Sequence, residues 1–189
     1  MEFRTKVDIP RATFSIAPCE RMLFVGSCFA DNMGQKFAED KFRAVVNPFG
    51  VMYNPASIMH TVERYQGEAP RVAVLTLGTN HIYILRETGE IVDNCNKRPQ
   101  RLFEERSLTA DECAGYLMRA VRHLQSRCAE VKVIVTVSPI RYAKYGYHGS
   151  MLSKATLLLA ADMLEKQMPD VVTYFPAYEI VNDELRDYR

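Results

Sequence analysis

The chain has 189 residues, and its 24 Lys and Arg against 23 Asp and Glu give a net charge of +1. This length suits one domain spanning 1–189, and a hydrophobic content of 48% excludes a disordered or collagen-like chain. The balanced charge argues against a nucleic-acid binder and against a polybasic membrane anchor, so we expect neither partner.

Short apolar runs alternate with helical patterns in the N-terminal half. Residues 22–25 form an apolar run that ends at Gly26 and is typical of a buried strand. A helical stripe follows over 28–42, then a short strand at 44–46 and a loop rich in Pro, Gly and Asn from 47 to 55. Residues 56–66 are predicted to be helical, and 72–77 form a third strand that stops at Gly78.

The C-terminal half continues the alternation after an insertion at about 81–108. Runs at 81–86 and 90–94 flank a Thr-Gly turn and predict a hairpin. The helix expected over 109–128 begins with a capping box, Thr109 with Glu112. The β-branched run at 131–137 predicts a central strand, with Val133, Ile134, Val135 and Val137 nearly fully buried. A helix over 150–167 and a strand over 171–175 complete the order.

This order predicts an α/β protein with a mostly parallel five-stranded sheet and helices on both faces, a three-layer sandwich. Ligands of such folds bind beyond the carboxyl ends of the strands. The segments that follow the strands are therefore the candidate site: 26–28, 47–50, 78–80 and 138–141.

Ser27 is the leading candidate residue, because it follows a strand and a glycine and precedes a helix. A helix N-terminus offers free N–H groups, so a serine there can be a nucleophile beside an oxyanion site. A helix cap is the alternative role, and serine often serves as one. Cys28 is a second candidate nucleophile, although free cysteines are usually buried.

Two further residues fit an oxyanion site by position alone. The Asn80 side chain and the Gly50 backbone could each donate a hydrogen bond, and each could equally be a turn residue. Among the four histidines, only His148 lies after the fourth strand of the sheet, in a loop, and it is the one candidate for a general base. The histidines form no HxH or HxxxH pair, so we expect no metal site.

The five cysteines have no CxxC spacing, and the first residues lack the apolar segment of a signal peptide. We therefore expect reduced thiols without a disulfide, and a cytoplasmic protein. A thiol enzyme that uses Cys28 and Cys95 is a remote alternative, since the two sulfurs would have to be close. The glycine-rich nucleotide loops are absent, and no cofactor is expected.

The pentapeptide Gly-Ser-Cys-Phe-Ala at 26–30 resembles the motif of the GSCFA family, which is similar to the SGNH/GDSL hydrolases. Segments at 47–50, 94–97, 136–141, 153–155 and 174–179 resemble family segments in the same order. The resemblance implies a flavodoxin-like, SGNH-type sheet with strand order 2-1-3-4-5. It also implies that Ser27 is the nucleophile of an acyl esterase, with carbohydrate acyl esters as one substrate class.

Under this resemblance, the N–H groups of Ser27 and Gly50 and the Asn80 side chain would complete an oxyanion hole. The other pocket residues would be Gly26, Cys28, Thr79, Asn94, Lys97, Ser138 and Arg141. The superfamily takes its base from a DxxH block beyond the last strand, and no DxxH follows residue 176. We therefore expect either that the sequence is a piece of a longer protein, which supplies this block, or that the protein lacks the usual base. Asn96 and Tyr142 stand where family members carry His. These differences favour the alternative function, a non-catalytic binding domain that keeps the fold and the pocket.

Overall fold

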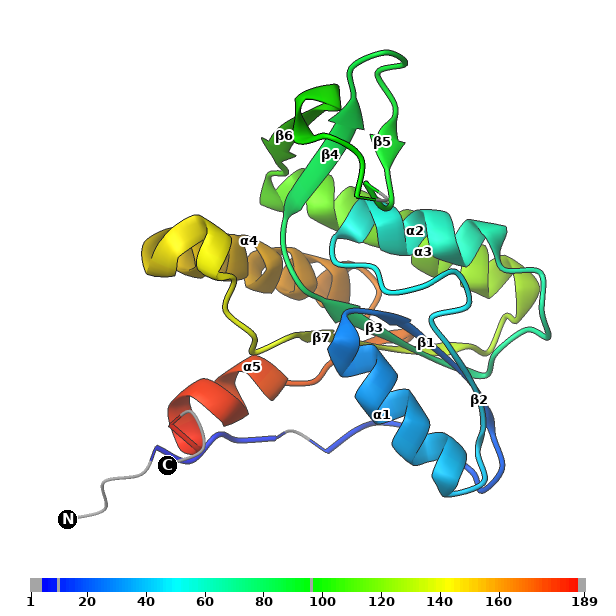
Figure 1. The fold of residues 1–189 in the computed structure, drawn as a ribbon. Coiled ribbons are helices and arrows are strands. Elements are labelled where there is room, and N and C mark those ends of the chain that lie inside the picture. The colour runs from blue at the N-terminus through cyan, green and yellow to red at the C-terminus, as the bar shows by residue number, and fades with distance from the viewer. Residues whose placement is uncertain (1–4, 10, 96, 187–189) are drawn as a thin grey trace.

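The computed structural model describes residues 5–9, 11–95 and 97–186 (Figure 1). A central sheet of five parallel strands has the order β2-β1-β3-β7-β8. Its strands are β1 (Arg21–Gly26), β2 (Arg43–Val46), β3 (Val72–Leu77), β7 (Lys132–Val137) and β8 (Val172–Tyr174). Counted within this sheet alone, the order is 2-1-3-4-5, which confirms the predicted α/β class and the predicted arrangement of strands.

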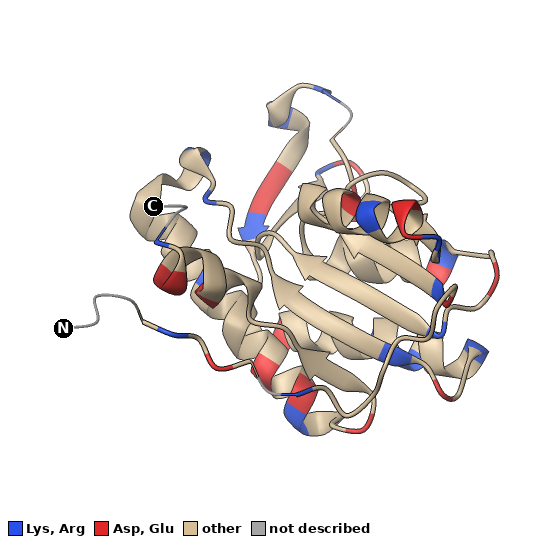
Figure 2. Ribbon diagram, turned by 90° about the horizontal axis from the view of Figure 1, so that it is seen from below, with Lys and Arg blue, Asp and Glu red and all other residues tan. Residues whose placement is uncertain are grey.

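Helices cover both faces of this sheet (Figure 1). They are α1 (Cys28–Glu39), α2 (Pro55–Arg64), α3 (Ala110–Arg127), α4 (Gly146–Gln167) and the short α5 (Ala177–Glu179), which continues into a π-helical turn, η3 (Ile180–Glu184). The larger apolar core joins α2, α3 and α4 to one face, through residues such as Ile58, Leu117 and Leu157. The smaller core packs α1 on the other face, around Phe24. In Figure 2, stretches of Lys and Arg lie among stretches of Asp and Glu on the helices and loops, whereas the strands of the central sheet are mostly tan.

The insertion forms a second, antiparallel sheet that projects beyond α2 and α3 (Figure 1). Its order is β5-β4-β6, with β4 (His81–Leu85), β5 (Ile91–Val92) and β6 (Phe103–Ser107), the last preceded by a 3₁₀ turn, η1 (Gln100–Leu102). The predicted hairpin exists, but β4 pairs more extensively with β6, which the sequence did not indicate. The reason is that only Phe103 of β6 is buried, so the strand lacks an alternating apolar pattern.

The expectation for β7 was wrong at one position. Val133, Val135 and Val137 are 0% exposed, whereas Ile134 is only partly buried. Ile134 faces the smaller core, where α1 packs mainly on β1, β2 and β3 and leaves the neighbouring β7 less covered. The two faces of a parallel strand are therefore covered unequally here.

The predicted capping box at the start of α3 is confirmed. The Thr109 Oγ1 accepts from the Glu112 backbone N–H at 3.2 Å, and the Glu112 carboxylate accepts from the Thr109 N–H at 2.8 Å. Thr109→Ala leaves the Glu112 N–H without its acceptor, and we expect it to lower the free energy of unfolding by about 1 kcal/mol. Chemical denaturation measures this change. Glu112→Gln keeps a side-chain acceptor and should cost less, so an equal loss for both variants would contradict this reading.

Candidate functional site

Ser27 lies at the carboxyl end of β1 and caps α1, as the sequence predicts. Its Oγ accepts from the Phe29 N–H at 3.3 Å and lies 3.2 Å from the Thr76 Oγ1, and its own N–H donates to that Oγ1 at 2.9 Å. The residue is 1% exposed. The Ser27 hydroxyl is thus placed at the predicted edge of the sheet, and it is covered in this structure.

The loop after β2 is fastened beside this turn. The Gly26 N–H donates to the Asn47 Oδ1 at 2.9 Å, and the Met52 N–H donates to the Gly26 carbonyl at 2.8 Å. The Asn47 amide in turn donates to the Asp31 carboxylate at 2.6 Å, which ties the loop to the first turn of α1. Gly50 lies in this loop, and its N–H donates to the Asn47 carbonyl at 2.8 Å.

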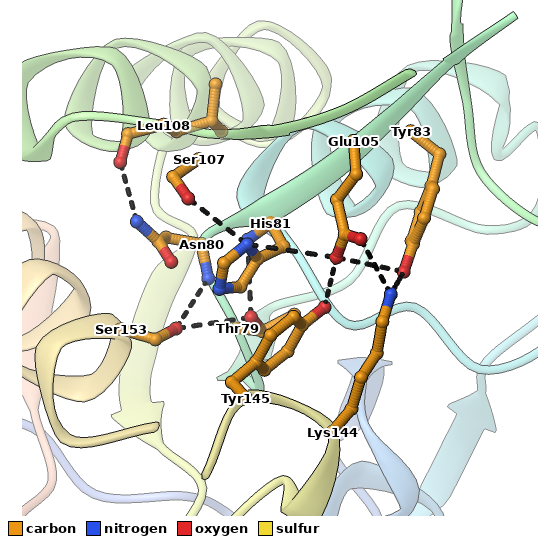
Figure 3. A network of polar contacts seen from close by, with 10 residues as sticks. All are labelled: Thr79, Asn80, His81, Tyr83, Glu105, Ser107, Leu108, Lys144, Tyr145 and Ser153. Atoms are coloured by element: carbon orange, nitrogen blue, oxygen red, sulfur yellow. Dashed lines mark hydrogen bonds and ion pairs between the residues drawn. The ribbon is translucent and has the colours of Figure 1, made fainter. Parts of the chain in front are cut away.

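Asn80 follows β3 and is held by contacts with Leu108 and with Ser153 of α4. Its Nδ2 donates to the Leu108 carbonyl at 2.7 Å, and its backbone N–H donates to the Ser153 Oγ at 3.1 Å (Figure 3). Its Oδ1 is buried and has no partner among the described residues. The three expected oxyanion donors, Ser27, Gly50 and Asn80, therefore each have an acceptor within the protein, and Asn80 lines a separate hollow with Leu108 and Ser153.

A cleft of about 300 Å³ lies beside this edge, between the second sheet and the segment after β7. We call it the tyrosine cleft, because its walls include the rings of Tyr53, Tyr83, Tyr142 and Tyr145. Thr79 and Asn94, both predicted as pocket residues, also line it, while Ser27 does not. Tyrosine rings offer broad apolar faces with a polar tip, a surface suited to small organic ligands.

Glu105 of β6 holds one wall of the tyrosine cleft in place (Figure 3). Its carboxylate accepts from the Lys144 ammonium at 2.7 Å, from the Tyr145 hydroxyl at 2.6 Å and from the Tyr83 hydroxyl at 3.1 Å; Lys144 also donates to Tyr83. Burial acts to raise the pKa of Glu105, but these donors outweigh it and lower that pKa. The ionised carboxylate thus ties the segment after β7 to the second sheet.

His81 is a cleft residue that sequence reasoning passed over. Its ring stacks on Tyr145 with the centroids 3.8 Å apart, and its Nδ1 lies 3.1 Å from the Ser107 Oγ (Figure 3). Burial lowers the pKa of His81, against the opposing effect of Glu105, and so favours the neutral imidazole at neutral pH.

Lys154 is the second residue that sequence reasoning missed. It is 1% exposed, and its Nζ donates to the Gly78 carbonyl at 2.6 Å, directly after β3. Burial lowers its pKa to about 7, because the charged ammonium loses its hydration. A signal did exist in the sequence, since Lys154 lies on the same helical stripe as the buried Leu157, Ala161 and Leu164.

Several predicted site residues lie apart from this edge or have other contacts. His148 is exposed in the first turn of α4, so the expected loop position was wrong: α4 begins at Gly146, four residues before the predicted start. Arg141 donates to the Asn182 side chain at 2.7 Å. Lys97 is exposed outside the cleft lining, and Ser138 is fully buried.

All five cysteines are free thiols. Cys28, the residue after Ser27, is partly exposed, and Cys95 lines the tyrosine cleft. Asn96 lies outside the described residues. Within 5–9, 11–95 and 97–186, no group of three His, Cys, Asp or Glu side chains could hold a metal ion. No helix in that part of the chain combines the length and apolar character needed to cross a membrane.

The structure defines an α/β protein with a parallel five-stranded sheet and a serine capping the helix after its first strand. The chain belongs to the GSCFA family, whose sequence model matches residues 21–71 and 67–189. No curated protein matches the chain. A crystal structure of another protein is similar at a TM-score of 0.47 and 13% identity, over 85% of this chain and 79% of that one.

Proposed function

We propose that the protein is a serine hydrolase of the SGNH type that cleaves acyl esters through Ser27. The observation that carries this proposal is the position of the Ser27 hydroxyl, at the carboxyl end of β1 and at the N-terminus of α1. Parallel sheets bind their ligands at this edge, and a helix N-terminus favours developing negative charge. The order of the strands is that of the flavodoxin-like SGNH sheet, which supports the same assignment.

In the proposed reaction, the Ser27 Oγ attacks the acyl carbon and a C–O bond forms. The serine proton passes to a base and then to the alcohol, which leaves as the ester C–O bond breaks. Water then hydrolyses the acyl-Ser27 intermediate and releases the acid. The oxyanion would be held by the N–H groups of Ser27 and Gly50 and by the second N–H of the Asn80 amide, so Ser27 and Gly50 must exchange their present acceptors for the substrate oxygen.

The proposed base is a histidine of a DxxH segment, as in the SGNH enzymes that the chain resembles. Among the described residues, the side-chain partner of the Ser27 Oγ is the Thr76 hydroxyl, which is too weak a base for this step. His148 is the local alternative, and its exposed position leaves it without a group that orients the ring.

Labelling with a fluorophosphonate probe tests the assignment of Ser27. We expect slow labelling of the wild type at Ser27, located by peptide mass spectrometry, because the serine is covered and has no fixed base among the described residues. Ser27→Ala should abolish it, while Ser126→Ala, at an exposed position of α3, should leave it unchanged. No adduct at Ser27 over a long incubation would refute the hydrolase proposal, and loss of labelling in His148→Ala would make His148 the base.

A non-catalytic binding domain is the second candidate function. The observation in its favour is that Ser27 is 1% exposed, whereas the tyrosine cleft, which Ser27 does not line, is accessible to a ligand. This function requires ligand binding that Ser27→Ala leaves intact, together with the absence of any fluorophosphonate adduct.

A further inference from the structure

Tyr142 belongs both to the tyrosine cleft and to the surroundings of Gly78, two residues after the Thr76 that contacts Ser27. It lines the cleft, and its hydroxyl oxygen lies so close to Gly78 that a Cβ there would approach it to 2.6 Å. Its ring meets Tyr53 edge-on, with the centroids 6.1 Å apart. Burial, with smaller contributions from Tyr53 and Cys28, raises the pKa of Tyr142 and keeps the phenol neutral. The Tyr142 side chain therefore extends from the tyrosine cleft to the turn that follows β3.

The Tyr142 side chain is held less firmly than its neighbour Tyr145. The backbone N–H of Tyr142 donates to the Ser150 Oγ at 3.2 Å, which fixes the main chain. Its hydroxyl makes no hydrogen bond to another described residue, whereas the Tyr145 hydroxyl is bound to Glu105 at 2.6 Å. The Tyr142 ring can thus turn about its side-chain bonds without breaking a hydrogen bond, and in turning it would leave only the Lys154 ammonium, 5.4 Å from its centroid, and the rings beside it.

The charged side chains around the cleft are already paired. Lys144 is bound to Glu105 at 2.7 Å, and the Asp93 carboxylate contacts His60 at 2.7 Å and Arg64 at 3.0 Å. A charged ligand would therefore have to break an existing pair, while an uncharged group can lie against the tyrosine rings. The volume of about 300 Å³ is at the small end for ligand pockets, so the group must also be short.

We propose that Tyr142 is a gate and a specificity-determining residue: its ring separates Ser27 from the tyrosine cleft and admits only short, uncharged acyl groups. This inference rests on the proposed function, because it assigns the cleft to the acyl part of the substrate. Since Ser27 is 1% exposed, some side chain must move before any reagent reaches it. Tyr142 has the freedom to do so, because its hydroxyl has no hydrogen-bond partner among the described residues.

Access can be measured without catalysis, by introducing a thiol at the position of the serine. The double variant Ser27→Cys with Cys28→Ala is treated with methyl and with octyl methanethiosulfonate. In each reaction the thiolate attacks the sulfenyl sulfur, a disulfide forms and methanesulfinate leaves with the electron pair. The rate of disulfide formation is followed at position 27, and we expect the methyl reagent to react faster there. Tyr142→Ala should raise the ratio of the octyl rate to the methyl rate by about tenfold or more, because differences in pocket size discriminate between ligands by at least this factor.

Three further variants control this measurement. Tyr142→Phe keeps the ring and loses only an unbonded hydroxyl, so it should behave like the unchanged tyrosine. Gly78→Ala places a methyl group 2.6 Å from the Tyr142 hydroxyl and should displace the ring, with the same effect as Tyr142→Ala. Tyr147→Ala, at a side chain that is 68% exposed, should change nothing. Cys113 is 0% exposed and must stay unlabelled, which reports that each variant is folded.

An unchanged ratio of octyl to methyl rates in both Tyr142→Ala and Gly78→Ala would overturn the gate. The fluorophosphonate experiment keeps the two proposals separate. A shifted thiol ratio without any Ser27 adduct would support the gate and reject the hydrolase. A Ser27 adduct with an unchanged thiol ratio would support the hydrolase and reject the gate.

Discussion

Gly26→Ala should lower the free energy of unfolding by more than about 4 kcal/mol, among the largest effects of a single substitution. A Cβ at this position would lie 2.2 Å from the Thr76 carbonyl oxygen and 2.4 Å from the Thr76 Oγ1. The carbonyl oxygen belongs to the backbone of β3, which pairs with β1 in the middle of the sheet, so it cannot move alone. The backbone φ of +145° adds strain, since side-chain-bearing residues rarely adopt it. Urea denaturation and the soluble yield measure the loss.

Two other glycines separate the contributions of strain and contact. Gly89 has a φ of +72° and open space around its missing Cβ, so Gly89→Ala should cost only about 1–2 kcal/mol. Gly115 lies inside α3 with no neighbour in reach, and Gly115→Ala should stabilise the protein by about 0.5–1 kcal/mol. If Gly26→Ala cost no more than Gly89→Ala, the close approach of β1 and β3 would not matter to the fold.

The wild type should gain stability relative to Lys154→Met as the pH rises from about 7 toward about 10.5. Burial lowers the folded-state pKa of Lys154 to about 7, below the ordinary value of 10.5 that applies to the unfolded chain. Between these values the unfolded chain binds one proton more, so the free energy of unfolding rises with pH. The slope is about 1.4 kcal/mol per pH unit, or about 4 kcal/mol over three units. Below about pH 7 the burial penalty is fully present, and above about pH 10.5 it is gone.

Lys154→Met suits this comparison because it preserves most of the side-chain volume while it removes the titrating amine. Its loss of the hydrogen bond to Gly78 is the same at every pH and does not affect the slope. Lys166→Met is the control, since that side chain is 74% exposed and its ammonium is in water before and after unfolding. Denaturation curves at about one-unit pH intervals give the differences. A constant difference between wild type and Lys154→Met would show that the buried ammonium stays charged.

The sequence by itself determined the features that depend on neighbouring residues. The apolar runs at β1, β3 and β7 are buried strands, because continuous apolar sequence is stable only where both faces are covered. The capping box of α3 and the serine cap of α1 follow from residue types at fixed spacing. The family motif at 26–30 lies where these local patterns put it, at the end of the first strand.

The tertiary structure alone decided which partners those residues have. Whether the N–H groups of Gly50 and Asn80 are free depends on the carbonyls of Asn47 and Leu108, which the spacing of the sequence does not reveal. β6 is a strand because β4 offers it an edge, although its own pattern is polar.

The tyrosine cleft has the same origin. Its rings come from three separate segments, at Tyr53, at Tyr83 and at Tyr142 and Tyr145, and they meet only when the folded chain brings the second sheet beside the segment after β7. Local patterns specify strands and caps because their energies are set within a few residues. The site is assembled from contacts between residues far apart in the sequence, such as Lys144 with Tyr83, which are 61 residues apart, and only the packed chain fixes those.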